Sequence, residues 1–147
     1  MRDRRGLRIL PTAECLRRLG RGGVGRVAVT VKALPAIFPV NYAVVDGDVV
    51  FRSNSGSKLS AASNRAVIAF EVDHTDAMGH TGWSVLVVGN AHVVTDPGEV
   101  SELDSLPLRP WAPGADDQYV RIAAGVISGR ELTHEIVDAD IPAKIGA

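Results

Sequence analysis

The sequence is short of the residues from which disulfides and metal sites are built. It has 147 residues with one cysteine, Cys15, and four histidines, so it cannot form a disulfide within itself. A single free thiol is typical of a reducing compartment, and we expect a cytoplasmic protein with Cys15 buried in a helix. His74 and His80 lie six residues apart without the spacing of zinc ligands, and no metal site is predicted.

Long apolar runs and nucleic-acid-reading motifs are also missing. No stretch approaches the roughly 20 apolar residues that span a bilayer, and no signal-peptide core follows the basic N-terminus. Residues 1–26 carry eight arginines against two acidic residues, but no aromatic side chains are interleaved to stack on bases. We therefore expect neither a membrane nor a nucleic acid as a partner. We interpret residues 1–10 as a solvated, partly flexible basic arm.

The remaining composition is that of one globular domain. The chain is 46% hydrophobic and 22% charged, which is enough to build a core. Runs of β-branched residues, several with period-two alternation, predict strands at 24–31, 36–45, 49–54, 66–73, 83–95, 119–123 and 126–132. Short helices are predicted at 12–20, 58–64 and 96–106. The strands are joined by short connections, which favour an antiparallel barrel. We place this domain at 11–137 and a loose tail at 138–147.

Two positions are expected to disturb the strands. Pro39 has no N–H to donate, which predicts an edge position or a bulge. Gly89 and Asn90 lie in the middle of the longest predicted strand and predict a bulge or bend there. We also expect a polar loop over 73–82, and a division between the last two strands at Gly125.

Residues 49–59 contain the strongest candidate for a ligand site. An apolar strand ends in a polar turn around Gly56, and a short helix follows the turn. The turn carries two cations and several hydroxyls, which can hold a phosphate near a helix N-terminus. The GxxxxGK[ST] pattern of a Walker loop is absent. The alternative is a solvated loop whose serines only close turns.

Several short phrases occur in the order in which a known family has them. They are Gly-Arg-Val-Ala from Gly25, Phe-Pro-Val-Asn-Tyr-Ala from Phe38, Phe-Arg-Ser from Phe51 with Gly-Ser-Lys-Leu from Gly56, Ala-Phe-Glu-Val-Asp from Ala69, Gly-Trp-Ser-Val-Leu-Val from Gly82 with Gly89, and Ile-Ser-Gly-Arg from Ile127. In these phrases the chain resembles the pyridoxamine 5′-phosphate oxidase-like, flavin-binding split-barrel proteins, in the branch of small actinobacterial members.

The resemblance implies a fold, an assembly and a cofactor site. The implied fold is mainly β, a six-stranded antiparallel split barrel with a few short helices. It forms a homodimer with two FMN sites shared across the dimer interface. The implied phosphate contacts are Arg52, Ser53, Ser57 and Lys58. The implied contacts to the ring system and ribityl chain are Pro39, Val40, Asn41 and Tyr42, together with Trp83, Ser84 and Val85, which could come from the partner subunit.

For two of these residues a purely structural role remains open. Trp83 offers a large flat face and one N–H, which suits packing beside an isoalloxazine. It would equally suit a core or interface position without a ligand. Asn41 would contact the flavin, or it would satisfy backbone groups beside Pro39. No catalytic residue can be assigned, and Tyr42 and Ser84 are candidates for a hydrogen bond or a proton to the flavin edge.

The resemblance implies an FMN-dependent oxidoreductase that acts on a small organic substrate. Relatives also use the deazaflavin F420 or bind haem, so the alternatives are an F420-dependent reductase and a non-catalytic flavin- or haem-binding module. In the haem case His92 or His134 would be the axial ligand. The C-terminal Arg and His pattern of the true pyridoxamine phosphate oxidases is not found, and that activity is not expected. The N-terminal arginines, Arg26 and Lys32 could offer a basic mouth to an anionic substrate.

Overall fold

The computed structural model of the chain describes residues 1–54, 56–109 and 117–133, apart from the side chains of residues 57, 59 and 63. The expected loose tail over 138–147 and His134 lie outside the described residues.

Within the described residues the chain forms seven strands and three helices. The strands are β1 (Arg8–Ile9), β2 (Gly23–Val31), β3 (Leu34–Val45), β4 (Asp48–Ser53), β5 (Val67–Asp76), β6 (Thr81–Val93) and β7 (Gln118–Leu132). The helices are α1 (Thr12–Leu19), α2 (Ser57–Ser63) and α3 (Pro97–Leu103). None of the described helices is long and apolar enough to cross a membrane.

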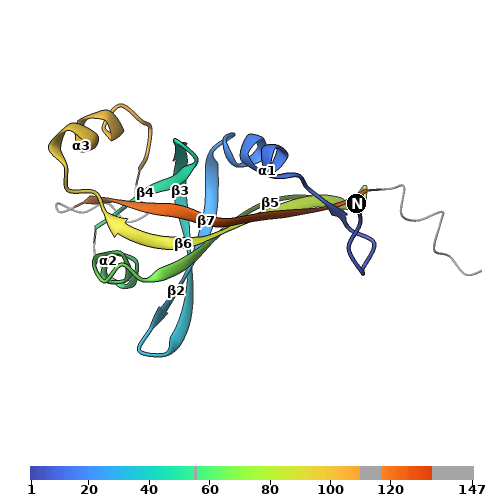
Figure 1. The fold of residues 1–147 in the computed structure, drawn as a ribbon, viewed down its shortest axis with the longest axis horizontal. Helices are drawn as coiled ribbons and strands as arrows, with labels where there is room; N and C mark the ends of the chain where they lie inside the picture. Colours follow the sequence, from blue (N-terminus) through green and yellow to red (C-terminus); the bar gives the residue numbers. More distant parts are fainter. Residues whose placement is uncertain (55, 110–116, 134–147) are drawn as a thin grey trace, which may run out of the picture.

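Six of the strands form a closed barrel. Their order is β7-β4-β3-β2-β5-β6, and β6 pairs with β7 to close the ring. Every pairing is antiparallel. This confirms the predicted mainly β, six-stranded antiparallel barrel with a few short helices. Figure 1 shows the β2–β3 hairpin projecting from the barrel, with α2 and the N-terminus at opposite ends of the long β5–β6 hairpin.

The last strands differ from the prediction in two ways. Polar residues pair along the β5–β6 hairpin as far as Asp76 and Thr81, so the predicted loop over 73–82 was wrong for most of its length. Their side chains are polar because they face solvent, while their backbone groups still pair. β7 is one continuous strand through Gly125, which was expected to divide it. The predicted bulge is present at the register shift between Val88 and Gly89, but the extra residue is Gly125 of the facing strand.

The N-terminal residues are tied to the barrel and do not form the free arm expected from their charge. Arg8 and Ile9 form β1, which pairs with the end of β7. The guanidinium of Arg8 binds Glu14 at 3.0 Å and Glu131 at 2.6 Å. The sequence predicted a solvated arm from its charge alone. The acidic partner on β7 could not be identified because it lies more than a hundred residues away in the chain.

Alternation along β4 separates two apolar cores. Val49 and Phe51 belong to the core inside the barrel. Val50 points the other way, into a smaller core with Leu103 of α3 and Leu108. Since successive side chains of a strand face opposite sides, Arg52 follows Val50 to the outer side and Ser53 follows Phe51 inward.

A row of apolar side chains crosses the outer face of the barrel. Its members are paired in register across five strands: Ile37, Ala28, Ala69, Val88 and Val126. At the two ends of this row Ile37 is 68% exposed and Val126 is 62% exposed. Exposed Val67 and Leu86 lie beside it. We call these seven residues the outer apolar row.

Pro39 lies in the half of β3 that pairs only with β2. It is opposite Arg26, and the β3–β4 pairing begins three residues later at Tyr42. The other edge of β3 is therefore unpaired with β4 at Pro39, where a missing N–H costs no ladder hydrogen bond. The predicted edge position is confirmed.

Candidate functional site

The predicted phosphate residues on β4 point to opposite sides of the strand. The outward guanidinium of Arg52 donates to Asp117 at 3.2 Å and to the carbonyl of Leu108 at 3.4 Å. It also lies 5.4 Å from the ring centroid of Tyr119. Arg52 is therefore committed to the segment that follows α3. Its side chain and that of Ser53 do not converge on one ligand within this chain.

Ser53 is the more unusual of the two residues. It is 2% exposed, and its Oγ is buried with no hydrogen-bond partner among the described residues. An unsatisfied buried hydroxyl costs about 1–3 kcal/mol, so native structures rarely keep one without a bound partner. The Nε of Arg52 is likewise buried without a partner in the described part of the chain, so both β4 residues carry an unsatisfied polar atom.

Lys58 lies close to Ser53 in the chain, near the start of α2. Its Nζ is 4.6 Å from the ring centroid of Phe38, and burial lowers its pKa. Within the described part of the chain it has no carboxylate partner. A half-buried ammonium without a counter-ion favours an anionic ligand. Ser57 begins α2, but its side chain lies outside the description.

Val40 and Tyr42 on β3 are core residues. The Tyr42 ring lies 4.6 Å from that of Phe70, and its hydroxyl donates to the carbonyl of Leu19 at 2.8 Å. Burial raises the pKa of Tyr42 to about 12. The suggestion that Tyr42 gives a proton or a hydrogen bond to a flavin stays a prediction. The Tyr42 hydroxyl is already used to hold the end of α1.

Pro39 and Asn41 alternate with these residues and lie on the outer side of β3. Pro39 is exposed. The Nδ2 of Asn41 donates to the carbonyl of Arg109 at 2.7 Å. Asn41 and Arg52 thus hold neighbouring carbonyls of the same segment, those of Arg109 and Leu108. The structure brings these two predicted site residues together through residues 108–109.

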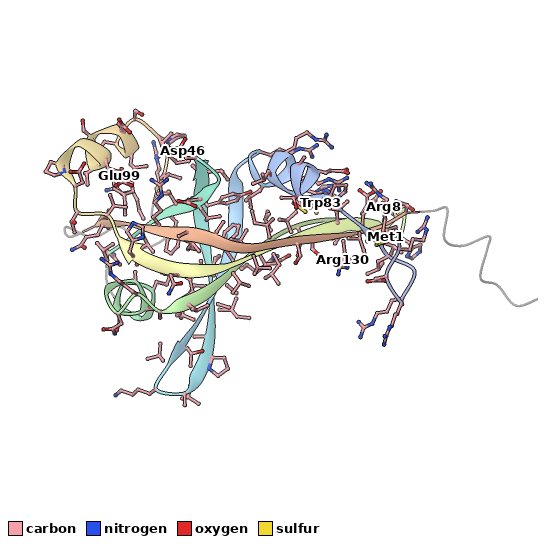
Figure 2. The ribbon with its side chains drawn as sticks, viewed as in Figure 1. Met1, Arg8, Asp46, Trp83, Glu99 and Arg130 are labelled. Carbon is pink, nitrogen blue, oxygen red and sulfur yellow. The ribbon has the colours of Figure 1, made fainter. Side chains whose placement is uncertain are left out.

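Trp83 lies at the other end of the molecule from α2. Figure 2 shows it beside α1, near Arg8 and Arg130. The Cζ of Arg18 is 5.2 Å from the Trp83 ring, a cation–π contact. Arg18 in turn binds Glu14 at 2.7 Å and Glu131 at 2.6 Å. The orientation of Trp83 therefore depends on the ion pairs that also anchor the N-terminus.

Ser84 and Val85 follow Trp83 on opposite faces of β6. Val85 is fully buried in the barrel core. Ser84 lines an open hollow of about 330 Å³ together with Trp83, Asp73 and Arg130. Ser84 therefore remains a candidate for a ligand contact through its hydroxyl, and Val85 does not through its side chain.

Three neighbouring hollows connect Trp83 with Asn41. The first holds Ser84 and shares Trp83 and Asp73 with a second of about 250 Å³. The second shares Arg21, Gly22 and Tyr42 with a third of about 480 Å³, which Asn41 lines. Arg109 in the third hollow was missed in the sequence analysis, and Arg21 was included there only as one of the N-terminal arginines. The Gly-Arg-Gly-Gly run at 20–23 was the signal for Arg21, and no local pattern pointed to Arg109.

The other basic residues differ in their availability. Arg26 is paired with Glu71 at 2.7 Å and Asp73 at 3.2 Å, so it does not offer a free charge to a substrate. Lys32 is exposed at the tip of the β2–β3 hairpin. His92 lines a polar hollow of about 360 Å³ with Arg65, Thr95 and Gln118. Among the described residues, no three His, Cys, Asp or Glu side chains gather in a way that could hold a metal ion.

Comparison with known proteins identifies a matching family and several similar proteins. Residues 11–131 match the family described as pyridoxamine 5′-phosphate oxidase. The uncharacterized protein Rv0080 of Mycobacterium tuberculosis is 41% identical over 121 residues, covering 79% of each chain.

Two solved structures share the fold. The FAD binding protein from Mycobacterium smegmatis is 34% identical with a TM-score of 0.72, covering 86% of this chain and 100% of its own. An FAD-binding protein from Mesorhizobium loti is 25% identical with a TM-score of 0.70, covering 86% and 99%. With most of the barrel matched by the family and by these relatives, the chain belongs to the pyridoxamine 5′-phosphate oxidase family.

Proposed function

We propose that the protein binds a flavin and acts as a flavin-dependent oxidoreductase on a small organic substrate. Two observations carry the proposal: among the described residues, Lys58 is a half-buried cation without a carboxylate partner, and the buried hydroxyl of Ser53, nearby in the chain, is unsatisfied. Ser53 is the last residue of β4 and Lys58 is the second residue of α2, and three residues separate the strand from the helix. A phosphate monoester would neutralise Lys58 and accept from Ser53.

Relatives support a flavin as the source of that phosphate. The Mycobacterium smegmatis protein, at 34% identity over nearly its whole length, is named for binding FAD. The flavin supplies hydride or electron transfer when it is bound, and the protein supplies position, access and charge. In this chain Lys58, Ser53 and Ser57 would hold the phosphate, and Arg52 would position residues 108–109 beside Asn41.

We further propose that the chain forms a homodimer and that each flavin site is completed by the partner copy. Four members of the outer apolar row are exposed and the other three are partly exposed, and an apolar surface of this kind marks a site of protein–protein contact. In a two-fold dimer the same row faces itself on the second copy. An apolar strip can pack against the same strip of a second copy, so no other kind of surface is needed to form the interface.

A shared site also accounts for the separation of the predicted contacts. The end of α2 is fixed to Asn90, whose Nδ2 donates to the carbonyl of Arg65 at 2.9 Å. Trp83 is seven residues earlier on β6, about 23 Å along an extended strand. One flavin would contact Lys58 of one copy and Trp83 of the other, with Ser84 reaching its edge.

A non-catalytic flavin- or haem-binding module is the second candidate. It is favoured by the burial of Tyr42, whose hydroxyl already donates to the carbonyl of Leu19 within the chain. His92 lines a hollow of its own and would be the haem ligand among the described residues. The F420-dependent reductase differs from the main proposal only in the cofactor.

The test is an absorbance spectrum of the purified protein, followed by titration with FMN, FAD, F420 and haemin. Saturable flavin binding near one per chain, with turnover of NAD(P)H or reduced F420, is the expected result. Tight flavin binding without turnover by either donor would favour the module. Preferential F420 binding would change the cofactor, and a Soret band would assign His92. Failure to bind all four would refute the proposed function.

A further inference from the structure

The largest of the three neighbouring hollows is formed by parts of the chain that are distant in sequence. It lies between the α1–β2 loop, the middle of β3 and the segment after α3, and has a volume of about 480 Å³. Its lining consists of Gly20, Arg21, Gly22, Gly23, Asn41, Tyr42, Ala43, Val44, Pro107, Leu108 and Arg109. No acidic residue is among them, so its two charged residues are both positive.

These two arginines stand apart from most others in the protein. Arg8, Arg17, Arg18, Arg26, Arg52, Arg121 and Arg130 each have a carboxylate within 3.4 Å. Arg21 and Arg109 have no carboxylate partner among the described residues, and both are exposed. Arg4, Arg5 and Arg65 are also without one, but they do not line this hollow. Two unneutralised guanidinium groups at one polar hollow favour an anion.

Arg21 is followed in its loop by two glycines with a left-handed backbone. Gly22 has φ +70° and Gly23 has φ +108°, a left-handed backbone that glycine adopts without strain. A Cβ at Gly23 would meet no atom within 4 Å, so the hollow is open at that point. The loop therefore presents Arg21 from a backbone whose conformation other residues would not readily take.

The negative end of α1 does not cancel the charge of Arg21. A helix C-terminus repels anions through its unpaired carbonyls. Here the carbonyl of Leu16 accepts from the N–H of Gly20. That of Leu19 accepts from the N–H of Gly22 and from the hydroxyl of Tyr42. With these carbonyls satisfied, the adjacent surface is open to a negatively charged group.

The opposite wall is fixed by residues already described. Asn41 and Arg52 hold the carbonyls of Arg109 and Leu108. The backbone that carries Arg109 is therefore held on β3 and β4 by two side-chain hydrogen bonds. Both arginines project from backbone that is positioned before any ligand binds, which lowers the entropy cost of binding.

We propose that this hollow binds the phosphate of a small molecule, at a site separate from Lys58. Arg21 also lines the neighbouring hollow beside Trp83 and His74. A phosphorylated molecule held by Arg21 can extend a flat ring toward Trp83, which suits a nucleotide. Such a nucleotide is either a separate substrate or the adenylate half of FAD, and both sources have the same phosphate chemistry.

The test follows the backbone amides of Gly22 and Gly23 by NMR while ADP, pyrophosphate or adenosine is added to the full-length protein. Saturable shifts with ADP and pyrophosphate, and none with adenosine, are expected. Arg21→Gln and Arg109→Gln should each weaken ADP binding about tenfold or more, the effect of losing a charge-assisted hydrogen bond. Arg65→Gln, at an exposed arginine outside the hollow, is the matched control.

Further titrations separate this site from the flavin site and identify the source of the phosphate. Lys58→Gln should leave ADP binding unchanged, so failure of the flavin proposal would not affect this result. An Arg21→Gln, Arg109→Gln double variant that loses FAD affinity but keeps FMN affinity would assign the phosphate to FAD. Unchanged FAD affinity with weakened ADP binding would assign it to a separate substrate. No glycine shifts, equal shifts with adenosine, or an equal loss in Arg65→Gln would overturn the proposal.

Discussion

Replacing Val126 by lysine should separate the proposed homodimer without unfolding the barrel. Val126 is 62% exposed on the outer apolar row, opposite Val88 in the register of β6 and β7. Its side chain contributes little to the core of a single chain because it faces away from the core. A Val126→Lys substitution would instead place a charge in the proposed interface, where two copies of the same row meet.

The size of the effect follows from burial of the valine. Full burial of a valine side chain is worth about 1.5–3 kcal/mol. Val126 is 62% exposed in the single chain, so a dimer can newly bury only that share, about 1–2 kcal/mol per copy. In a two-fold dimer the substitution occurs twice, so the loss is about 2–4 kcal/mol, which raises the dimer Kd about 30- to 10³-fold. The charge adds to this loss, since an unpaired ammonium in an apolar interface is unfavourable.

Sedimentation equilibrium at micromolar concentration measures the effect directly. The wild-type chain should sediment as a dimer of a 15.5 kDa protomer, and Val126→Lys should sediment as a monomer with an unchanged circular dichroism spectrum. Met78→Lys is the control, because Met78 is 93% exposed in the β5–β6 turn and lies outside the outer apolar row. A monomeric wild type, or a Val126→Lys dimer as tight as wild type, would refute the reasoning.

Three further predictions concern stability. Tyr42→Phe removes the hydrogen bond to Leu19 and should lower the unfolding free energy by about 1 kcal/mol in urea titrations; no change would show that the bond contributes nothing. Gly89→Ala would place a Cβ 1.8 Å from the carbonyl oxygen of Ala123, so it should cost more than about 3 kcal/mol, and a normal melting temperature would contradict this packing. Glu14 has its pKa lowered to about 2 by hydrogen bonds from Arg8 and then Arg18. Its stabilising contribution is therefore present above about pH 4.5 and declines as the pH falls toward 2; Glu14→Gln should flatten the dependence, and an identical profile in the variant would contradict it.

Local sequence patterns favoured an antiparallel barrel, and the family resemblance added that it has six strands. Alternating valines over 24–31 and the apolar run over 66–73 have the period of strands, and short connections leave only antiparallel pairing. The strands predicted at 36–45 and 49–54 are separated by three residues, and the structure pairs them as the β3–β4 hairpin. Pro39 was placed on an edge because a missing N–H has a direct geometric consequence. These features depend on neighbours within a few residues.

The features that were missed depend on partners far apart in the chain. Glu131 of β7 binds Arg8 of the basic N-terminus. Arg109 and Arg21 line the same hollow because the folded barrel brings these distant segments together. One feature of the candidate site could have been predicted from the sequence itself. Arg52 and Ser53 are consecutive residues of a strand, and the period of two already implied that their side chains face opposite sides.

The measurement that most directly tests the flavin proposal compares FMN with riboflavin, which lacks the phosphate. Wild-type protein should bind FMN more tightly than riboflavin. Lys58→Ala should reduce that difference by about 1–3 kcal/mol, or about 5- to 150-fold in relative affinity. Lys32→Ala, at the exposed tip of the β2–β3 hairpin, should leave the difference unchanged. An equal preference for FMN in wild type and Lys58→Ala would contradict a phosphate site at Lys58.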